Sequence, residues 1–286
     1  MKPINGHTQI AGVIGNPIGH TLSPAIHNML AEETGYDLAY AAFPVGTGRL
    51  EKAIEGAFAL GIKGLNITVP YKQDVIPFLS DIDPLAEKIG AVNTLVRTED
   101  GYKGYNTDMP GLLRAFKRDG VGIEGEDIIV LGAGGVARAV VMLLEENGAG
   151  SVTIINRNSD RAEELAGAVN SIAGRNFARP LSIGGYNMLP EGERYIVIQA
   201  TSVGMSPDTG KAVIEDPEFY KHVKTGYDLI FNPKVTRFME LCEEAGAASY
   251  NGSRMLLYQG IIAYEYWTGK DVSEETADKV FEKVFA

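Results

Sequence analysis

Short apolar runs and amphipathic helical patterns alternate along most of the 286-residue chain. In the first third, this alternation predicts three strands and two helices, at Gln9–Ile14, Pro24–Thr34, Leu38–Phe43, Leu50–Leu60 and Lys63–Val69. Strands that are separated by helices in this way are typical of βαβ units. We therefore expect a mostly parallel sheet with helices packed against it.

The first predicted helix begins with a Ser-Pro pair. Ser23 is expected to be its N-cap, because a serine hydroxyl accepts a hydrogen bond from the first turn. Pro24 suits the first helical position, where its missing N–H leaves nothing unpaired. The second helix is expected to end at Gly61.

A hairpin pattern follows the third strand. Ala91–Arg97 and Gly101–Asn106 are two strand-like runs joined by a short turn, so the sheet is expected to gain an antiparallel edge. Leu112–Arg118 then has a helical pattern. We place a domain boundary in the helix that starts near Met109.

A second alternating region comes after a glycine-rich segment. Its predicted elements are strands at Ile128–Leu131, Val152–Asn156, Tyr195–Ala200 and Gly226–Ile230, helices at Val136–Asn147 and Asp160–Val169, and a long apolar helix at Ser253–Trp267. The last helix is expected to return to the first domain. The expected fold is therefore a two-domain α/β protein, with a mixed, mostly parallel domain at 1–108 joined by 250–286, and a second domain at 109–249.

Composition narrows the functional classes. The chain is 45% hydrophobic and 22% charged, which is typical of a globular protein. Its formal net charge of −11 disfavours binding to nucleic acid, which depends on basic residues. No apolar run reaches the ~18 residues of a membrane span, and the N-terminus lacks a signal-peptide core. We expect a cytoplasmic protein with no membrane partner.

Cysteine and histidine give no sign of a metal site. The one cysteine, Cys242, shares a predicted helical face with apolar residues and is expected to be a small buried hydrophobe. The four histidines, His7, His20, His27 and His222, lack zinc-ligand spacing with each other or with Cys242. No metal cofactor is expected.

A glycine-rich turn follows the strand at Ile128–Leu131. A tight turn there needs Gly132, and close approach of a pyrophosphate to the backbone needs Gly134. The next helix would present its N-terminal N–H groups to the anion. The expected binding segment consists of Gly132, Ala133, Gly134, Gly135, Val136 and Ala137. This pattern predicts a Rossmann-type dinucleotide site.

The end of the following strand indicates NADP rather than NAD. NAD sites place an acidic residue there to hold the ribose 2′-hydroxyl, whereas this chain has Asn156-Arg157-Asn158 with Arg161 one helical turn later. Arg157 and Arg161 are expected to bind the 2′-phosphate, because guanidinium groups suit bidentate phosphate binding. A methyltransferase would also use a glycine-rich turn, but it too normally has an acidic residue at this place.

Polar residues gather where strands of the first domain are expected to end. Asn66, Thr68 and Lys72 close the strand at Lys63–Val69, and open α/β sheets bind ligands at such ends. Asn93 and Asp108 belong to two further polar segments, Asn93-Thr94 and Asn106-Thr107-Asp108. A lysine with a carboxylate neighbour can exchange a proton with an alcohol. The spacing alone does not establish that Lys72 and Asp108 meet.

These motifs together resemble the shikimate dehydrogenase family over nearly the whole chain. The matching segments are Gly15-Asn16-Pro17, Thr21-Leu22-Ser23-Pro24, Asn66-Ile67-Thr68-Val69-Pro70-Tyr71-Lys72, Gly90-Ala91-Val92-Asn93-Thr94, Gly104-Tyr105-Asn106-Thr107-Asp108, Gly132-Ala133-Gly134-Gly135, Asn156-Arg157, Ala200-Thr201-Ser202-Val203-Gly204-Met205, Tyr227-Asp228 and Gln259-Gly260. Because several independent motifs occur in one order, the resemblance is specific.

The resemblance implies an activity. It implies the reversible reduction of 3-dehydroshikimate by NADPH to shikimate, in the chorismate route to aromatic amino acids. It also implies that Lys72 and Asp108 are the catalytic pair, with Lys72 exchanging the proton and Asp108 orienting it. The first domain would bind this small-molecule substrate and the Rossmann domain NADP, and the protein would be a monomer or a homodimer.

The same resemblance implies the contacts of the substrate and the cofactor. Thr21 and Ser23 would bind the substrate carboxylate. The other substrate contacts would be Asn66, Asn93 and Gln259 to ring hydroxyls, Thr68 in support and Tyr227 closing the site. Thr201 and Met205 would line the cofactor site with Asn156. Each has a plainer alternative: Ser23 as a helix cap, Gln259 as a polar group of the core, Tyr227 and Met205 as packing residues.

Two departures from the family pattern leave alternatives open. Thr21 stands where a serine is usual, and its extra methyl group affects the choice between shikimate and quinate. Asn158 stands where a threonine is often found, which would loosen the preference for NADP. The alternatives are a quinate/shikimate dehydrogenase that uses both cofactors, and a non-catalytic sensor that binds NADP or shikimate. The presence of both Lys72 and Asp108 argues against a sensor.

Overall fold

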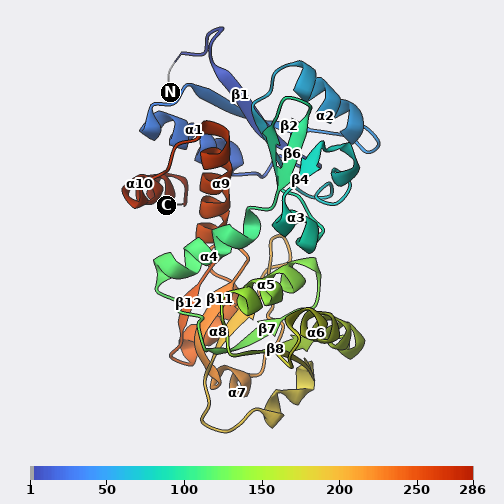
Figure 1. Ribbon diagram of the computed structural model, residues 1–286. Coiled ribbons are helices and arrows are strands. Elements are labelled where there is room, and N and C mark those ends of the chain that lie inside the picture. The colour runs from blue at the N-terminus through green and yellow to red at the C-terminus, as the bar shows by residue number, and fades with distance from the viewer. Residues whose placement is uncertain (1–2, 286) are drawn as a thin grey trace. The chain divides into compact units, whose positions relative to one another are not determined.

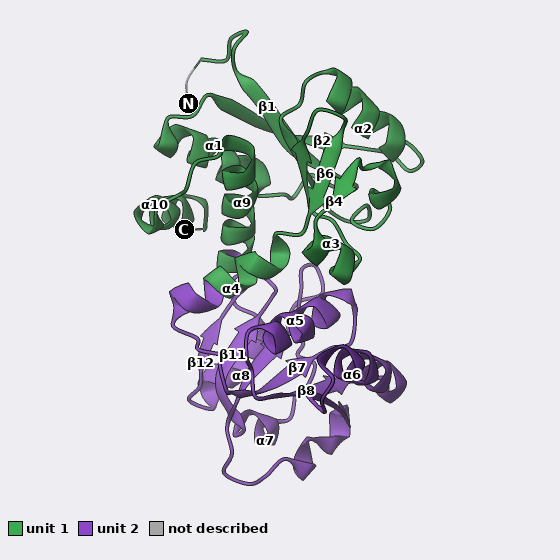
Figure 2. Ribbon diagram, viewed as in Figure 1, with its two compact units in different colours: residues 1–114, 254–286 green, residues 115–253 purple. Residues whose placement is uncertain are grey.

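A computed structural model of the chain describes residues 3–285. The chain divides into two compact units, which are shown in different colours in Figure 2. Unit 1 comprises Met1–Arg114 and Arg254–Ala286, and unit 2 comprises Ala115–Ser253. Each unit has its own six-stranded sheet, and the expected two-domain α/β fold is confirmed.

Unit 1 follows the predicted order of elements closely. Its strands are β1 (Gln9–Gly15), β2 (Leu38–Pro44), β3 (Gly64–Ile67), β4 (Asp81–Ile82), β5 (Thr94–Arg97) and β6 (Tyr102–Tyr105). Its helices are α1 (Ser23–Thr34), α2 (Leu50–Ala59), a 3-10 turn at Ile76–Phe78, α3 (Pro84–Ile89), the start of α4 (Asp108–Asp119), α9 (Ser253–Thr268) and α10 (Glu274–Phe285). The short β4 and α3 have no counterpart in the prediction, and α10 lies in the region 250–286, where C-terminal helices were expected without bounds of their own.

The sheet of unit 1 has the order β2-β1-β3-β5-β6-β4. The hairpin of β5 and β6 forms as predicted, but β5 is antiparallel to both of its neighbours and lies inside the sheet. The edge position is taken by β4, which pairs in parallel with β6. The predicted antiparallel edge is therefore wrong, because a strand of only two residues covers it.

Side chains of β3 alternate between the two faces of this sheet. Leu65 and Ile67 join an apolar core with residues of α2. On the other face, a Cβ on Gly64 would collide with Trp267 of α9, whose indole N–H donates to the carbonyl of Leu95 at 2.9 Å. Asn66 lies on the same face as Gly64, so α9 covers the side of the sheet from which this amide projects (Figure 1).

Unit 2 has an all-parallel sheet with the strand order β12-β11-β10-β7-β8-β9. Its strands are β7 (Asp127–Leu131), β8 (Ser151–Asn156), β9 (Ala178–Ser182), β10 (Tyr195–Gln199), β11 (Val223–Asp228) and β12 (Ala248–Tyr250). Its helices are α5 (Gly135–Glu146), α6 (Ser159–Ala173), a 3-10 helix at Ile183–Met188, α7 (Pro217–Tyr220) and α8 (Arg237–Glu244). Counted from β7, this is the 3-2-1-4-5-6 order of the Rossmann fold, in which the order of the strands reverses between β7 and β10.

Helices cover both faces of the sheet of unit 2. Residues of α7 and α8 share an apolar core with Ile129 and Leu131, while α5 contacts β7 and β8. Cys242 in α8 is completely buried, and a Cβ on Gly226 would lie 2.5 Å from its Sγ. Burial raises the pKa of the Cys242 thiol to about 12. The prediction of a small buried hydrophobe is confirmed. Within residues 3–285, no helix is long and apolar enough to cross a membrane.

Candidate active site

Lys72 and Asp108 meet in unit 1. Lys72 lies in the turn after β3, and Asp108 is the first residue of α4. Lys72 Nζ donates to Oδ2 of Asp108 at 2.6 Å, and the two side chains are 32% and 20% exposed. A carboxylate at a helix N-terminus is stabilised by the helix dipole. The pair is thus partly buried and still open to a reactant.

Asn93 holds the other oxygen of the same carboxylate. Its Nδ2 donates to Oδ1 of Asp108 at 2.9 Å. The backbone N–H of Thr107 donates to Asn93 Oδ1 at 2.8 Å. Because a peptide N–H can only donate, Oδ1 of Asn93 must face Thr107 and Nδ2 must face Asp108. Sequence reasoning did not give Thr107 a role, although it lies in one of the polar segments.

Asn66 lies deeper, on β3. It is 5% exposed, accepts a hydrogen bond from the phenol of Tyr40 at 2.7 Å, and donates to Oγ1 of Thr94 at 3.0 Å. Thr68 lies just beyond the strand, which ends at Ile67, so it is not on the strand face with Asn66 as predicted. The backbone N–H of Thr68 still pairs with the carbonyl of Ile14 at 2.9 Å.

Thr21 and Ser23 lie together at the start of α1. Oγ1 of Thr21 donates to Oγ of Ser23 at 3.1 Å, so the two hydroxyls are close enough to face one carboxylate. The prediction that Ser23 caps the helix is wrong: Leu22 is the N-cap, and no side chain among residues 3–285 caps α1. Because Ser23 is already the first helical residue, its hydroxyl is not engaged in the cap.

Gln259 and Tyr227 are both buried, in different units. Gln259 on α9 is 8% exposed, and its Nε2 donates to the carbonyl of Leu256 at 2.9 Å. Tyr227 on β11 has no exposed surface and donates to Oδ2 of Asp119 at 3.0 Å, and its ring packs edge-on against Phe116. These contacts pack Tyr227 within unit 2, and its expected role in closing a substrate site stays a prediction.

The glycine-rich turn of unit 2 has the features that a pyrophosphate needs. Gly132 has a φ of +116°, which other residues rarely adopt. Gly134 is the N-cap of α5. In the described part of the chain, no side chain caps this helix, and nothing lies within 4 Å of a Cβ on Gly134 or Gly135. Val136 is 51% exposed, whereas Ala137 is buried against the sheet. The free N–H groups of a helix N-terminus therefore face open space, as an anion site requires.

Arginines follow the neighbouring strand β8. Arg157 and Arg161 are exposed, and in the described chain neither guanidinium has a hydrogen bond or an ion pair. Asn158 is the N-cap of α6 and accepts from the N–H of Arg161 at 3.2 Å, while Nδ2 of Asn156 donates to the carbonyl of Asn158 at 2.9 Å. Arg157 thus precedes α6 and Arg161 lies in its first turn, both without a side-chain partner among residues 3–285. They follow β8, which pairs with the strand before the glycine-rich turn and ends without an acidic residue.

The loop after β10 carries Thr201 and Met205. Thr201 lies against Gly132, and Met205 is 47% exposed. Two buried polar residues that sequence reasoning missed hold this loop: Gln199 accepts from the N–H of Thr201 at 2.6 Å, and Asp228 accepts from Gln199 at 3.3 Å. Burial raises the pKa of Asp228 to about 6. Their signal in the sequence is a polar residue at the end of each of two apolar strands.

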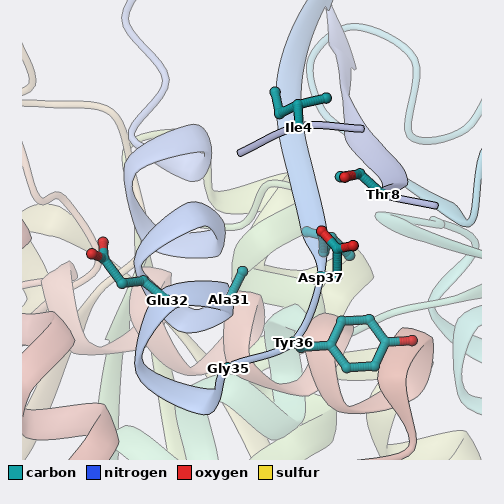
Figure 3. Close-up of a pocket in the computed structure, with 8 residues that line it drawn as sticks. Ile4, Thr8, Ala31, Glu32, Gly35, Tyr36 and Asp37 are labelled. Carbon is teal, nitrogen blue, oxygen red and sulfur yellow. The ribbon is translucent and has the colours of Figure 1, made fainter. Parts of the chain in front are cut away.

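A separate hollow in unit 1 contains none of the predicted site residues. It has a volume of about 230 Å³ and is lined by Ile4, Thr8, Ala31, Glu32, Gly35, Tyr36, Asp37 and Leu38 (Figure 3). Among residues 3–285, no group of three or more His, Cys, Asp or Glu side chains is placed to hold a metal ion.

Comparisons with known proteins cover both units. Three protein-family models match the chain. The family model described as "Shikimate dehydrogenase substrate binding domain" matches residues 13–95. The one described as "Shikimate / quinate 5-dehydrogenase" matches residues 115–179, and the one described as "Shikimate 5'-dehydrogenase C-terminal domain" matches residues 252–280. The chain is 39% identical to a shikimate dehydrogenase (NADP(+)) of Moorella thermoacetica, over 98% of this chain and 95% of that protein.

Solved structures of similar proteins agree. A shikimate dehydrogenase in complex with NADP⁺ has a TM-score of 0.89 at 33% identity and covers 99% of this chain and 98% of its own. A shikimate 5-dehydrogenase of Listeria monocytogenes in complex with shikimate and NAD also has a TM-score of 0.89 at 33% identity, over 100% of this chain and 99% of its own. The likeness extends over both units and the whole length, and the chain belongs to the shikimate dehydrogenase family.

Proposed function

We propose that this protein is an NADP-dependent shikimate dehydrogenase, which reversibly reduces 3-dehydroshikimate to shikimate. In the reduction, the carbonyl carbon receives a hydride and the carbonyl oxygen receives a proton. NADPH supplies the hydride when bound, and the protein supplies the proton. The observation that carries the proposal is the pair of Lys72 and Asp108, held at 2.6 Å and flanked by Asn93.

Lys72 is the proton donor of the reduction. Its ammonium group has three N–H bonds, and one donates to Asp108, which leaves two for the substrate oxygen. Asp108 orients Nζ and balances its charge, while Asn93 prevents the carboxylate from rotating. Because the side chain of Lys72 is 32% exposed, solvent can return its proton after each turnover. In the oxidation of shikimate the same group accepts the proton from the hydroxyl.

Hydroxyl and amide groups of unit 1 bind the rest of the substrate. Thr21 and Ser23 donate to its carboxylate, which their 3.1 Å separation permits. Asn66, Asn93 and Gln259 hold its ring hydroxyls. Thr68 supports the pocket beside Asn66. The expected role of Tyr227, which is buried in unit 2, stays a prediction.

Residues of unit 2 suit the binding of NADP. The open N-terminus of α5 suits the pyrophosphate, and Arg157 and Arg161 suit the 2′-phosphate because neither has another partner within the described chain. Asn156, Thr201 and Met205 complete this site. We accordingly assign substrate binding to unit 1 and cofactor binding to unit 2. The protein is proposed to be a cytoplasmic monomer or homodimer, which light scattering on the purified protein tests for its mass.

Steady-state kinetics with shikimate and quinate, each with NADP and NAD, tests the function. The expected preference is for shikimate and NADP. Oxidation of quinate at a similar rate would support the second candidate, a quinate/shikimate dehydrogenase, which the methyl group of Thr21 makes worth testing. Binding of NADP and shikimate without turnover of any pair would contradict the proposal and support a sensor.

A further inference from the structure

A chain of hydrogen bonds runs through the interior of unit 1 to the carboxylate of Asp108. Tyr40 donates to Oδ1 of Asn66 at 2.7 Å, and Nδ2 of Asn66 donates to Oγ1 of Thr94 at 3.0 Å. Thr94 donates to Oδ1 of Asn93 at 3.1 Å, and Nδ2 of Asn93 donates to Oδ1 of Asp108 at 2.9 Å. We call these five residues the relay. They come from β2, β3, the first residue of β5 with the residue before it, and the start of α4.

Two peptide groups fix the orientation of both amides in the relay. The N–H of Thr107 can only donate, so it fixes Oδ1 of Asn93 on its own side. The carbonyl of Asn93 can only accept, and Nδ2 of Asn66 lies 3.3 Å from it, so Oδ1 of Asn66 must face Tyr40. Tyr40 must therefore be a donor. Thr94 already accepts from Asn66, so its own proton goes onward, either to Oδ1 of Asn93 at 3.1 Å or to Oγ1 of Thr107 at 3.2 Å. The hydroxyl of Thr107 itself donates to Oδ1 of Asn93 at 3.2 Å, so on either route the donors point toward Asp108.

The relay is buried, and the two aromatic groups at its Tyr40 end are neutral. Tyr40, Asn66, Asn93 and Thr94 are all at most 5% exposed, and hydrogen bonds in such surroundings reinforce one another. Burial raises the pKa of the Tyr40 phenol well above its usual value, so the phenol keeps its proton. The ring of His27 stacks on Tyr40 with centroids 4.2 Å apart, and burial lowers the pKa of this imidazole to about 3, so it is neutral.

We propose that Tyr40 is a positioning residue of the reaction, which acts through the relay on the carboxylate that orients Lys72. The inference rests on the proposed function, because it concerns the same catalytic pair. The phenol and the carbonyl of Asn93 together hold the amide of Asn66, and Asn66 in turn determines to which group Thr94 gives its proton. Without the phenol, the long 3.3 Å bond to the carbonyl of Asn93 is the contact that still opposes rotation of this amide, which therefore turns over more readily. Thr94 then donates back to Asn66 instead of to Asn93, and Asn93 keeps its bonds from Thr107 but holds Asp108 less firmly.

The first test removes only the hydroxyl, in Tyr40→Phe. We expect kcat for shikimate oxidation to fall about three- to tenfold, the effect of one internal hydrogen bond, with the KM for NADP unchanged. The matched control is Tyr102→Phe, because Tyr102 is 1% exposed and its hydroxyl donates to the carbonyl of Ile62 at 2.8 Å, outside the relay. The control should keep the wild-type kcat. Thermal unfolding of both variants checks that each is folded at the assay temperature.

A double-mutant cycle separates a relay from a merely structural effect. Thr94→Val breaks the relay in the middle and keeps the shape of the side chain. In the Thr94→Val background, Tyr40→Phe should change kcat by less than about twofold, because its route to Asp108 is already cut. If the fold-changes in kcat of the two single variants multiply in the double variant, the proposal is overturned. An unchanged kcat in Tyr40→Phe alone would also overturn it. If Tyr40→Phe does not fold, the kinetics of Thr94→Val alone test the proposal. A fall in kcat with an unchanged KM for NADP supports the relay, and a wild-type kcat overturns it.

Turnover assays of the wild-type protein distinguish a failure of the relay from a failure of the proposed function. If the wild type oxidises shikimate and the two variants match it, only the relay fails. If the wild type itself does not turn over shikimate or quinate with either cofactor, the proposed function fails, and with it the reaction that the relay would serve.

Discussion

Gly132 lies so close to Thr201 that a Cβ at Gly132 would stand 2.8 Å from Cγ2 of the threonine. The two residues follow β7 and β10, the neighbouring strands between which the strand order reverses. In open parallel sheets, ligands bind at this reversal, outside the carboxyl ends of the strands. The contact therefore leaves room for only a glycine at the tightest part of the proposed cofactor site.

Replacement of Gly132 by alanine should harm both folding and cofactor binding. The φ of +116° and the contact with Thr201 should together cost about 1–3 kcal/mol in the free energy of unfolding, and the KM for NADP should rise. The matched control is Gly167→Ala, in the middle of α6, where nothing lies within 4 Å of the new Cβ. It should be more stable than the wild type by about 0.5–1 kcal/mol. Equal stability of the two variants in urea unfolding would contradict this prediction.

Loss of the Lys72 amine should remove most of the turnover. In Lys72→Ala we expect kcat to fall about 10²- to 10⁴-fold, the usual contribution of a general acid or base. NADP binding, measured by calorimetry, should stay nearly the same because Lys72 belongs to unit 1 and contacts Asp108 there. Substantial turnover in this variant would show that another group exchanges the proton.

Arg157→Ala should weaken NADP far more than NAD. A charge-assisted hydrogen bond contributes about 1.5–3 kcal/mol, so the KM for NADP should rise by about one to two orders of magnitude. NAD has no 2′-phosphate, and its KM should change little. Arg175→Ala, just beyond the C-terminal end of α6, is the control and should leave both constants unchanged. An equal change for the two cofactors in Arg157→Ala would rule out recognition of the 2′-phosphate.

His27 should make the protein sensitive to acid. Burial lowers the pKa of its imidazole from 6.5 to about 3, so the unfolded chain takes up a proton at a higher pH than the folded chain. The contribution of His27 to stability is therefore complete above pH 6.5 and is lost progressively as the pH falls toward 3. At about 1.4 kcal/mol per pH unit, the loss between pH 6.5 and 5 is about 2 kcal/mol.

The variant His27→Phe tests this linkage, because a phenyl ring can stack on Tyr40 but does not titrate. Unfolding in urea at pH 7.5 and pH 5 should show that the wild type loses about 2 kcal/mol more than the variant over this interval. An equal loss in both proteins would mean that other groups cause the acid sensitivity.

Asp228 should contribute a pH dependence of stability opposite in sign to that of His27. Its pKa is raised to about 6 by burial, so the folded protein binds a proton that the unfolded chain releases near pH 4. The wild type should therefore gain stability relative to Asp228→Asn as the pH falls from 7 to 4, in the same unfolding experiment. A constant difference between the two proteins across this range would contradict a shifted pKa.

The longer elements could be predicted from the sequence, and the shortest could not. Helices such as α5 and strands such as β8 contain enough residues for a periodic pattern to be recognised. β4, with two residues, and β12, with three, are too short to show any period. Their strand pairing comes from neighbours elsewhere in the sheet. The hairpin of β5 and β6 was predictable from its local pattern. Its place inside the sheet was not, because that place depends on pairing with β3 and β4.

The residues of the candidate site were partly predictable. The glycine-rich turn and the arginines after β8 lie within one βαβ unit, so local sequence was sufficient to find them. Ser23 shows the limit of local reasoning, because its neighbours suggested a helix cap that the structure does not form. Tyr227 shows another limit: its position in a motif suggested a binding role, and only its packing revealed a buried ring.

The sequence by itself determined the family, the two-domain α/β plan and the chemical types of the site residues, since these depend on local pattern and on motifs. Only the tertiary structure decided that Lys72 and Asp108 touch, and that the donors from Tyr40 to Asn93 all point to one carboxylate. Hydrogen bonds are effective only over about 3 Å. Whether distant segments come that close depends on the order and pairing of the strands, which no single segment encodes.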